Sequence, residues 1–121
     1  MIVKVSTYLM FTGQAAEALA LYTEVFPESE SSVRDGPVYM ADWRLAGHDV
    51  MLVDSPPVHD FTFTPSTSLF VDFDDAAALD ATFAKLSDGG SVMMPVDNYG
   101  FSQRFGWVAD RFGVNWQLNQ P

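Results

Sequence analysis

Residues 3–26 read VKVSTYLMFTGQAAEALALYTEVF and predict a strand followed by a helix. The first part, residues 3–11, is rich in β-branched and aromatic side chains, which favour a strand. In residues 14–26, apolar side chains recur at steps of three and four and therefore share one face of a helix. These side chains are Ala15, Leu19, Tyr22 and Phe26, and Pro27 then ends the helix. The stretch thus predicts an amphipathic helix that packs against a sheet.

Three short strands and a loop are predicted after this helix. The strands cover residues 30–34, 38–45 and 49–54, and the first of them is polar on both faces. Residues 46–48, Ala-Gly-His, predict the turn between the last two strands. Residues 55–66 contain three prolines and predict a loop that joins two halves of the chain.

The same order of elements then starts again. Asp74 and Asp75 predict the start of a second helix, because carboxylates there accept hydrogen bonds from free backbone N–H groups. The second set consists of a strand at residues 67–73, a helix at 76–86 and strands at 91–96, 105–110 and 114–119. We therefore predict one α+β domain over residues 1–121, with two βαβββ modules at about residues 1–55 and 66–121. In each module the helix covers one sheet face, and we expect the other face to curve into a cup that carries the chemistry.

Composition limits the classes of partner and site. The chain of 121 residues is 48% hydrophobic, which suffices for a packed core. Its net charge of −10 repels phosphate backbones, so we expect no nucleic-acid partner. The absence of Cys excludes disulfides and thiolate metal ligands. No signal-peptide pattern or long apolar run is visible, so we expect a cytoplasmic protein that does not bind membranes.

Four stretches resemble a known superfamily. They are Tyr8–Phe11, Ala15–Pro27 (AAEALALYTEVFP), Gly106-Trp107 and Asp110–Leu118 (DRFGVNWQL). Together with the repeat, they resemble the vicinal oxygen chelate superfamily, also called the glyoxalase/bleomycin-resistance/dioxygenase fold. The PhnB-like branch, often named 3-demethylubiquinone-9 3-methyltransferase-like, is the most similar. The resemblance implies paired βαβββ modules with cupped mixed sheets, and a divalent metal held in the cup by His and Glu.

Carrying over the metal-ligand positions of the superfamily gives an unusual set. They fall at or next to Thr7 on the first strand, near Asp54 on the fourth, at Ser68 and at Gln117. Two hydroxyls and a neutral amide are weak ligands, because Zn, Fe, Ni and Mn prefer imidazole, carboxylate or thiolate. We therefore predict no metal and no cofactor, and we predict these four residues as ligand-binding residues of the cup.

Aromatic side chains are candidates for the wall of such a pocket. Trp43 and Phe70 are predicted to contact the ligand, with Phe101, Phe105 and Trp107 as further candidates. Packing in the core or at a dimer interface is the alternative for all of them. A largely apolar pocket with a few polar anchors is typical of a small-molecule site.

Polar residues outside the carried-over positions are interpreted from their local pattern. Asn115, Gln117 and Asn119 alternate with apolar residues, so the two sets lie on opposite faces of the last strand. This polar set either lines the cup or forms a solvent-facing stripe. His48, placed in a turn, and His59, placed in the proline-rich loop, are interpreted as surface residues.

The preferred function is a metal-free small-molecule-binding protein of this superfamily, with the ligand unknown. The alternative is an enzyme of the same superfamily, a lyase, an isomerase or a dioxygenase, with or without a metal. No Gly-rich turn between a strand and a helix supports a site for S-adenosylmethionine. We also expect a homodimer, because many members of the superfamily form homodimers.

Overall fold

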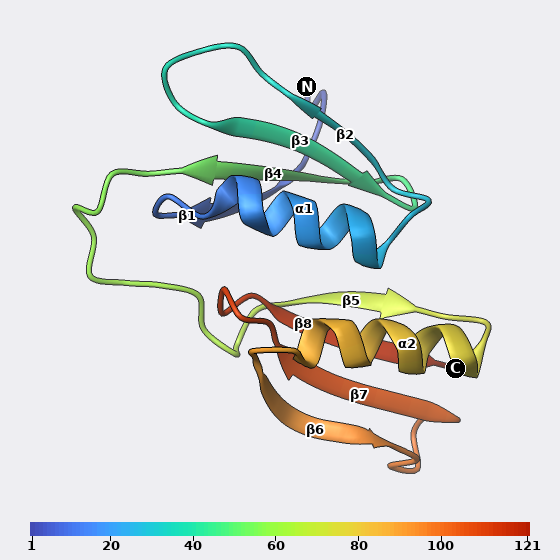
Figure 1. Ribbon diagram of the computed structural model, residues 1–121. Helices are drawn as coiled ribbons and strands as arrows, with labels where there is room; N and C mark the ends of the chain where they lie inside the picture. The colour runs from blue at the N-terminus through green and yellow to red at the C-terminus, as the bar shows by residue number, and fades with distance from the viewer. The chain divides into compact units, whose positions relative to one another are not determined.

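The computed structural model describes residues 1–121, which divide into two compact units. Unit 1 spans Met1–Asp60 and unit 2 spans Phe61–Pro121. Each unit contains one strand, one helix and three further strands in chain order, which confirms the predicted α+β class (Figure 1). The boundary between the units falls within the loop at residues 55–66. The expectation that the two units form one domain stays a prediction.

Unit 1 is one helix on a mixed four-stranded sheet with the order β1-β4-β3-β2. Strand β1 pairs with β4 in parallel, and the other pairs are antiparallel. The elements are β1 (Thr7–Phe11), α1 (Ala15–Val25), β2 (Glu30–Val33), β3 (Met40–Leu45) and β4 (His48–Asp54). The sheet face away from α1 is called the helix-free face of unit 1.

Unit 2 repeats this topology with the strand order β5-β8-β7-β6. Strand β5 pairs with β8 in parallel, and the other pairs are antiparallel. The elements are β5 (Ser68–Asp72), α2 (Ala76–Ser87), β6 (Ser91–Asp97), β7 (Arg104–Ala109) and β8 (Asn115–Gln120). The sheet face away from α2 is called the helix-free face of unit 2.

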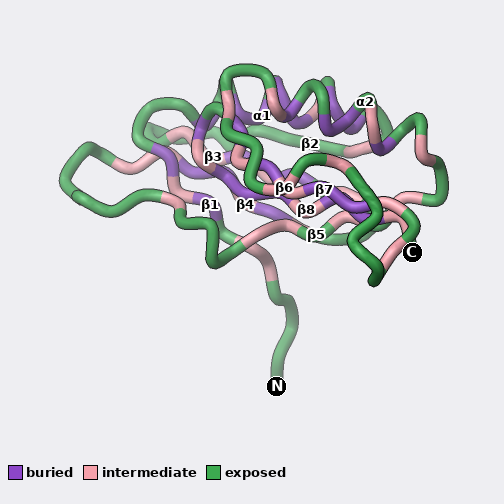
Figure 2. The backbone as a smooth tube through the Cα atoms, turned by 90° about the horizontal axis from the view of Figure 1, so that it is seen from below, coloured by how far each residue is buried: buried purple, intermediate pink, exposed green.

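The core of each unit lies between the helix and the sheet. In unit 1, Tyr22 of α1 packs against Trp43 of β3, with the ring centroids 5.4 Å apart. In unit 2, the apolar face of α2 packs on buried residues of β7 and β8, among them Val108, Trp116 and Leu118. The buried segments in Figure 2 are mainly the helices and the central strands, whereas the segment before β1 is exposed.

The helices begin by two different means. Asp75 caps α2 as predicted, because its Oδ2 accepts a hydrogen bond of 3.0 Å from the backbone N–H of Ala78. Helix α1 has Gln14 at the cap position, and that side chain makes no cap hydrogen bond. Asp54 of β4 instead accepts hydrogen bonds at the start of α1, as described below. Neither helix is long and apolar enough to cross a membrane.

Two predicted boundaries need correction. The first strand begins at Thr7 rather than at residue 3, and the residues before it are mostly exposed. His48 is the first residue of β4 rather than part of the turn. The turn consists of Ala46 and Gly47, both with positive φ angles of 49° and 83°. Two successive residues with positive φ angles are typical of the two-residue turn of a β-hairpin.

Candidate functional site

The helix-free face of unit 2 carries polar and aromatic side chains in rows across the sheet. The strand register sets Phe70 of β5 opposite Gln117 of β8, and Gln117 opposite Trp107 of β7. Trp116 and Leu118 point to the other face, where they are fully buried under α2. The alternation predicted for this strand from the sequence is therefore present in the structure.

Ser68 and Gln117 form a hydrogen-bonded pair on this face. Gln117 Nε2 donates a hydrogen bond of 3.2 Å to Ser68 Oγ, and both residues are half-buried. The Gln117 carbonyl oxygen accepts no hydrogen bond from the protein, and the Ser68 hydroxyl hydrogen donates to no other protein group. The pair thus presents one acceptor and one donor beside the rings of the adjacent strands.

The two asparagines of the same strand are occupied by the protein itself. Asn115 Oδ1 accepts a hydrogen bond of 2.9 Å from Trp107 Nε1, and Asn115 Nδ2 donates to the Gly113 carbonyl at 3.1 Å. Asn119 Nδ2 donates to Asp72 Oδ1 at 2.8 Å, and its Oδ1 accepts from the Ser102 hydroxyl. Both amides are buried and hydrogen-bonded at each end. Gln117 therefore differs from its two neighbours, because part of its bonding capacity is unused.

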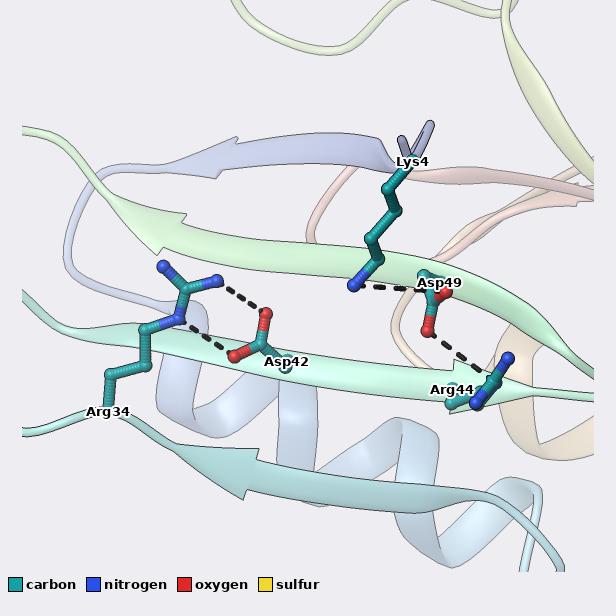
Figure 3. Close-up of polar contacts among 5 residues, drawn as sticks. All are labelled: Lys4, Arg34, Asp42, Arg44 and Asp49. Atoms are coloured by element: carbon teal, nitrogen blue, oxygen red, sulfur yellow. Dashed lines mark hydrogen bonds and ion pairs between the residues drawn. The ribbon is translucent and has the colours of Figure 1, made fainter. Parts of the chain in front are cut away.

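The helix-free face of unit 1 has a different chemistry, because it is lined with charges. Arg34 donates two hydrogen bonds of 2.8 Å to the carboxylate of Asp42. Asp49 lies between Arg44 Nε at 3.6 Å and Lys4 Nζ at 3.9 Å (Figure 3). The hydrogen bond from Arg34, followed by its charge, lowers the pKa of Asp42, and burial of the carboxylate opposes this. The basic partners are exposed and the two carboxylates are half-buried, and each carboxylate has a cationic partner.

Thr7 and His48 form a contact that the sequence interpretation missed. Thr7 Oγ1 and His48 Nε2 lie 2.9 Å apart, at the starts of β1 and β4. Thr7 lies two and four residues before the buried Leu9 and Phe11, so its side chain shares their parity, that of the α1 side of the sheet. No local pattern in the sequence indicates this contact, because it depends on the parallel pairing of β1 with β4.

Asp54 and Trp43, also predicted as ligand-binding residues, have structural contacts in unit 1. Asp54 Oδ1 accepts hydrogen bonds from the backbone N–H groups of Gly13 at 3.0 Å and Ala15 at 2.9 Å, so it caps α1 from β4. Trp43 is buried on the α1 side of the sheet, against Tyr22 and Phe26. Of the six predicted residues, Ser68, Phe70 and Gln117 lie together on the helix-free face of unit 2, whereas Thr7, Trp43 and Asp54 belong to unit 1 and follow the parity of its α1 side.

The motif DRFGVNWQL at residues 110–118 is explained by one buried carboxylate. Asp110 Oδ1 accepts hydrogen bonds from the backbone N–H groups of Phe112 at 2.9 Å and Val114 at 3.1 Å. Asp110 Oδ2 accepts a hydrogen bond of 2.9 Å from Trp116 Nε1. The motif therefore closes the turn between β7 and β8 and fixes the strand that carries Gln117.

A family comparison decides the classification. The family model for 3-demethylubiquinone-9 3-methyltransferase matches residues 3–119, which is nearly the whole chain. The chain belongs to this family. Membership includes it among the PhnB-like proteins of the vicinal oxygen chelate superfamily, as the sequence resemblance predicted.

Individual relatives agree with this assignment. Protein YjdN of Escherichia coli is 26% identical over 137 residues, covering 94% of this chain and 92% of YjdN. The structure of the PhnB protein from Bacillus cereus is 40% identical, with a TM-score of 0.90 and coverage of 98% of this chain and 100% of that one. A glyoxylase/bleomycin resistance protein/dioxygenase domain from Frankia shares the fold, with a TM-score of 0.72 at 16% identity and coverage of 99% and 93%.

The metal typical of the superfamily does not fit the residues at the carried-over positions. Thr7 Oγ1 is hydrogen-bonded to His48, and the Ser68 and Gln117 side chains bond to each other. Asp54, the one carboxylate of the set, caps α1 through Oδ1. Within each unit, no three His, Cys, Asp or Glu side chains form a group that could hold a metal ion. Hydroxyls and an amide do not replace the nitrogen and carboxylate ligands that divalent transition metals prefer.

Proposed function

We propose that the protein is a metal-free small-molecule-binding protein whose ligand contacts the Ser68–Gln117 pair on the helix-free face of unit 2. The free carbonyl oxygen of Gln117 supports this more than any other observation. A half-buried amide oxygen that accepts no hydrogen bond from the protein can exchange its water for a ligand donor, with a net gain of about 1 kcal/mol. Phe70 and Trp107, opposite Gln117 on the adjacent strands, supply the apolar surroundings typical of such sites.

The pair is suited to orient a ligand rather than to transform it. The Ser68 hydroxyl has no imidazole or carboxylate hydrogen-bonded to it, so the base that activates a nucleophilic serine is not at hand. Its hydroxyl hydrogen and the Gln117 carbonyl oxygen together match a ligand group that accepts one hydrogen bond and donates another. A carboxamide, an alcohol or a lactam has this chemistry.

The family description names a methyltransferase, and we do not transfer that activity to this chain. The two strand-to-helix turns, residues 12–14 and 73–75, contain one glycine between them. A Gly-rich turn is the usual means by which a nucleotide-bearing cofactor approaches the backbone.

The location in the cytoplasm and the choice between a binder and an enzyme stay predictions from the sequence.

A ligand screen on matched variants tests the proposed function. A library of uncharged and charged small molecules is screened by thermal shift against the wild type, Gln117→Leu and Gln120→Leu. Gln120 is the control because it is an amide on the same strand. It pairs with Arg104 and has the same parity as Trp116 and Leu118, so its position belongs to the sheet face that α2 covers. We expect compounds that raise Tm in the wild type and in Gln120→Leu but not in Gln117→Leu. Equal shifts in all three proteins, or no shifting compound, would contradict the proposal.

We also propose that the protein forms a homodimer. Large apolar side chains at Val33, Val38 and Val58 are exposed, and burial of such residues between two copies would stabilise a dimer. Light scattering at micromolar concentration is expected to give the mass of two chains. The mass of one chain would refute the dimer without affecting the ligand site.

A further inference from the structure

We propose that the ligand of unit 2 is an organic cation that rests on an aromatic platform flanked by two carboxylates. This inference depends on the proposed function, because it names the chemical class of the ligand for the same face. The aromatic platform consists of Phe70 on β5, Phe105 on β7, and Tyr99 and Phe101 in the loop between β6 and β7.

Phe105 is the floor of the platform. Its side chain is buried, with only 4% of the residue exposed. Its ring centroid lies 5.0 Å from that of Phe101, 6.1 Å from that of Tyr99 and 6.4 Å from that of Phe70. Three rings therefore surround one buried ring on the helix-free side of the sheet.

The three surrounding rings are exposed. The exposed fractions are 57% for Phe70, 38% for Tyr99 and 63% for Phe101. Most of the buried core of unit 2 lies on the other sheet face, and on this face the rings surround Phe105. A group of adjacent exposed aromatic side chains marks an interaction site more often than scattered single ones do. The faces of aromatic rings carry negative partial charge and attract a cation within about 6 Å of the ring centroid.

The loop that carries two of these rings is held in place by its own hydrogen bonds. Asp97 Oδ1 accepts a hydrogen bond of 2.7 Å from the backbone N–H of Asn98. Asn98 Oδ1 accepts one of 2.8 Å from the backbone N–H of Gly100. The Tyr99 hydroxyl donates to the Pro95 carbonyl, and the Ser102 hydroxyl donates to Asn119 on β8. A platform ordered before binding costs little conformational entropy when the ligand arrives.

Two carboxylates give this face its electrostatic preference. The strand register sets Asp72, Asn119, Phe105 and Asp97 in one row across the sheet. Asp72 Oδ1 and Asp97 Oδ1 accept hydrogen bonds from the protein, and the second oxygen of each accepts none. Each carboxylate therefore keeps an acceptor for a ligand.

No cation of unit 2 lies over a ring of the platform. Lys85 is on α2, and Arg104 donates two hydrogen bonds to Asp80 of α2. The Arg111 guanidinium lies 4.7 Å from the Phe112 ring centroid, in the turn after β7. Arg104 also interacts electrostatically with Asp97 and partly neutralises it, whereas no Lys or Arg forms an ion pair with Asp72 at the other end of the row. Such a surface is complementary to an alkylammonium or a protonated amine with an apolar body, and it repels anions.

Three benzyl compounds of different charge test the inference. Benzyltrimethylammonium, benzyl alcohol and phenylacetate are titrated into the full-length protein at low salt, and two-dimensional NMR reports which backbone amides shift. We expect the cation to bind most tightly and phenylacetate most weakly, with shifts at residues 70, 97–105 and 117. The preference for the cation should decrease as salt is added.

Two variants separate the aromatic contribution from the acidic one. Tyr99→Leu/Phe101→Leu keeps apolar area but removes the ring faces, and it should weaken cation binding about two- to thirtyfold. Asp97→Asn should weaken binding of the cation but not of benzyl alcohol. Asp88→Asn is the charge-matched control, because Asp88 is an exposed carboxylate at the end of α2, and it should leave the affinities unchanged.

The outcomes distinguish this inference from the proposed function. If benzyl alcohol binds as tightly as the cation, or phenylacetate binds more tightly, the inference is wrong while the proposed small-molecule site stands. If none of the probes shifts unit 2, the inference is also wrong, and the library screen above decides the proposed function separately. If the platform amides shift with protein concentration alone, the platform is an interface between copies and the inference is overturned.

Discussion

Gln117 donates a hydrogen bond of 3.2 Å to Ser68, a residue 49 positions earlier in the chain, and keeps its carbonyl oxygen unbonded. This bond crosses the parallel β5–β8 pair on the sheet face away from α2. The flanking amides Asn115 and Asn119 are each bonded through both the oxygen and the nitrogen. At this pair, therefore, a ligand can form a hydrogen bond with the strand without breaking a hydrogen bond within the protein.

Replacing Gln117 should change ligand affinity more than stability. Gln117→Leu removes one hydrogen bond and keeps the side chain's apolar contacts, so we expect a loss of at most about 1 kcal/mol in the free energy of unfolding. A ligand that bonds to the free carbonyl should bind about fivefold more weakly, which corresponds to about 1 kcal/mol. Urea unfolding and isothermal titration measure the two effects. A variant that unfolds easily but binds normally would show that Gln117 has a structural role only.

Asp110 should be important for stability through the turn that it closes. In Asp110→Asn an amide N–H₂ replaces one carboxylate oxygen, so either the two backbone N–H groups or the Trp116 indole loses its acceptor. We expect a loss of about 1.5–3 kcal/mol, as for other hydrogen bonds to buried charged groups. Chemical denaturation checks this, with Asp88→Asn as the exposed control. An unchanged free energy of unfolding would contradict the assigned role of the turn.

Asp54 should act as a cap for α1 whose effect depends on an acceptor rather than on charge. Asp54→Ala leaves the N–H groups of Gly13 and Ala15 without this partner and should cost about 0.5–2 kcal/mol. Asp54→Asn keeps an oxygen at the same place and should remain close to the wild type. The test is the Tm of both variants by circular dichroism. Equal losses in both would show that Asp54 acts through its charge.

Gly106 is expected to tolerate no side chain. A Cβ at this position would lie 2.7 Å from Phe83 Cε2 and 2.8 Å from Val96 Cγ2. Gly106→Ala should therefore cost about 1–3 kcal/mol through overpacking between α2 and the sheet. The smaller ring-free side chain in Phe83→Leu should relieve part of this, so the double variant should be more stable than the sum of the single effects implies. Simple additivity would show that Phe83 is not the source of the clash.

The Arg34–Asp42 pair should contribute to stability only when Asp42 is ionised. The hydrogen bond from Arg34 lowers the pKa of Asp42 below its value in the unfolded chain. The folded state therefore binds the proton less readily, and the contribution is present above the unfolded pKa and lost as pH falls through the lowered folded pKa. The stability difference between the wild type and Asp42→Asn should be small at neutral pH, because the pair is exposed, and should vanish in acid. A difference that grows toward low pH would have the wrong sign.

The local sequence pattern predicts most of the fold. Apolar residues recur at steps of three and four in residues 14–26, and the structure buries them on one face of α1. Polar and apolar residues alternate around Gln117, and the structure buries the apolar set under α2. The alternation of Ala41 and Trp43 with Asp42 and Arg44 would also have placed Trp43 in the core, since charged residues on the intervening positions mark the exposed face.

Contacts between distant residues were not predictable in this way. The Thr7–His48 and Asp54–Gly13 contacts each join positions 41 residues apart, and they depend on the parallel β1–β4 register. The exposed rings of Tyr99 and Phe101 depend on how one loop folds over the sheet. Neither composition nor periodicity contains that information, because it arises from pairing and loop closure rather than from local preference.

The side-chain amide signal of Gln117 in two-dimensional NMR tests the central claim most directly. The wild type, with the signal assigned by comparison with Gln117→Leu, is recorded with and without each compound that raises Tm in the library screen. We predict that these compounds shift the Gln117 Nε2 proton signals and the backbone amides of residues 68–70. Compounds that stabilise the protein while these signals stay unchanged would contradict a ligand site at the Ser68–Gln117 pair.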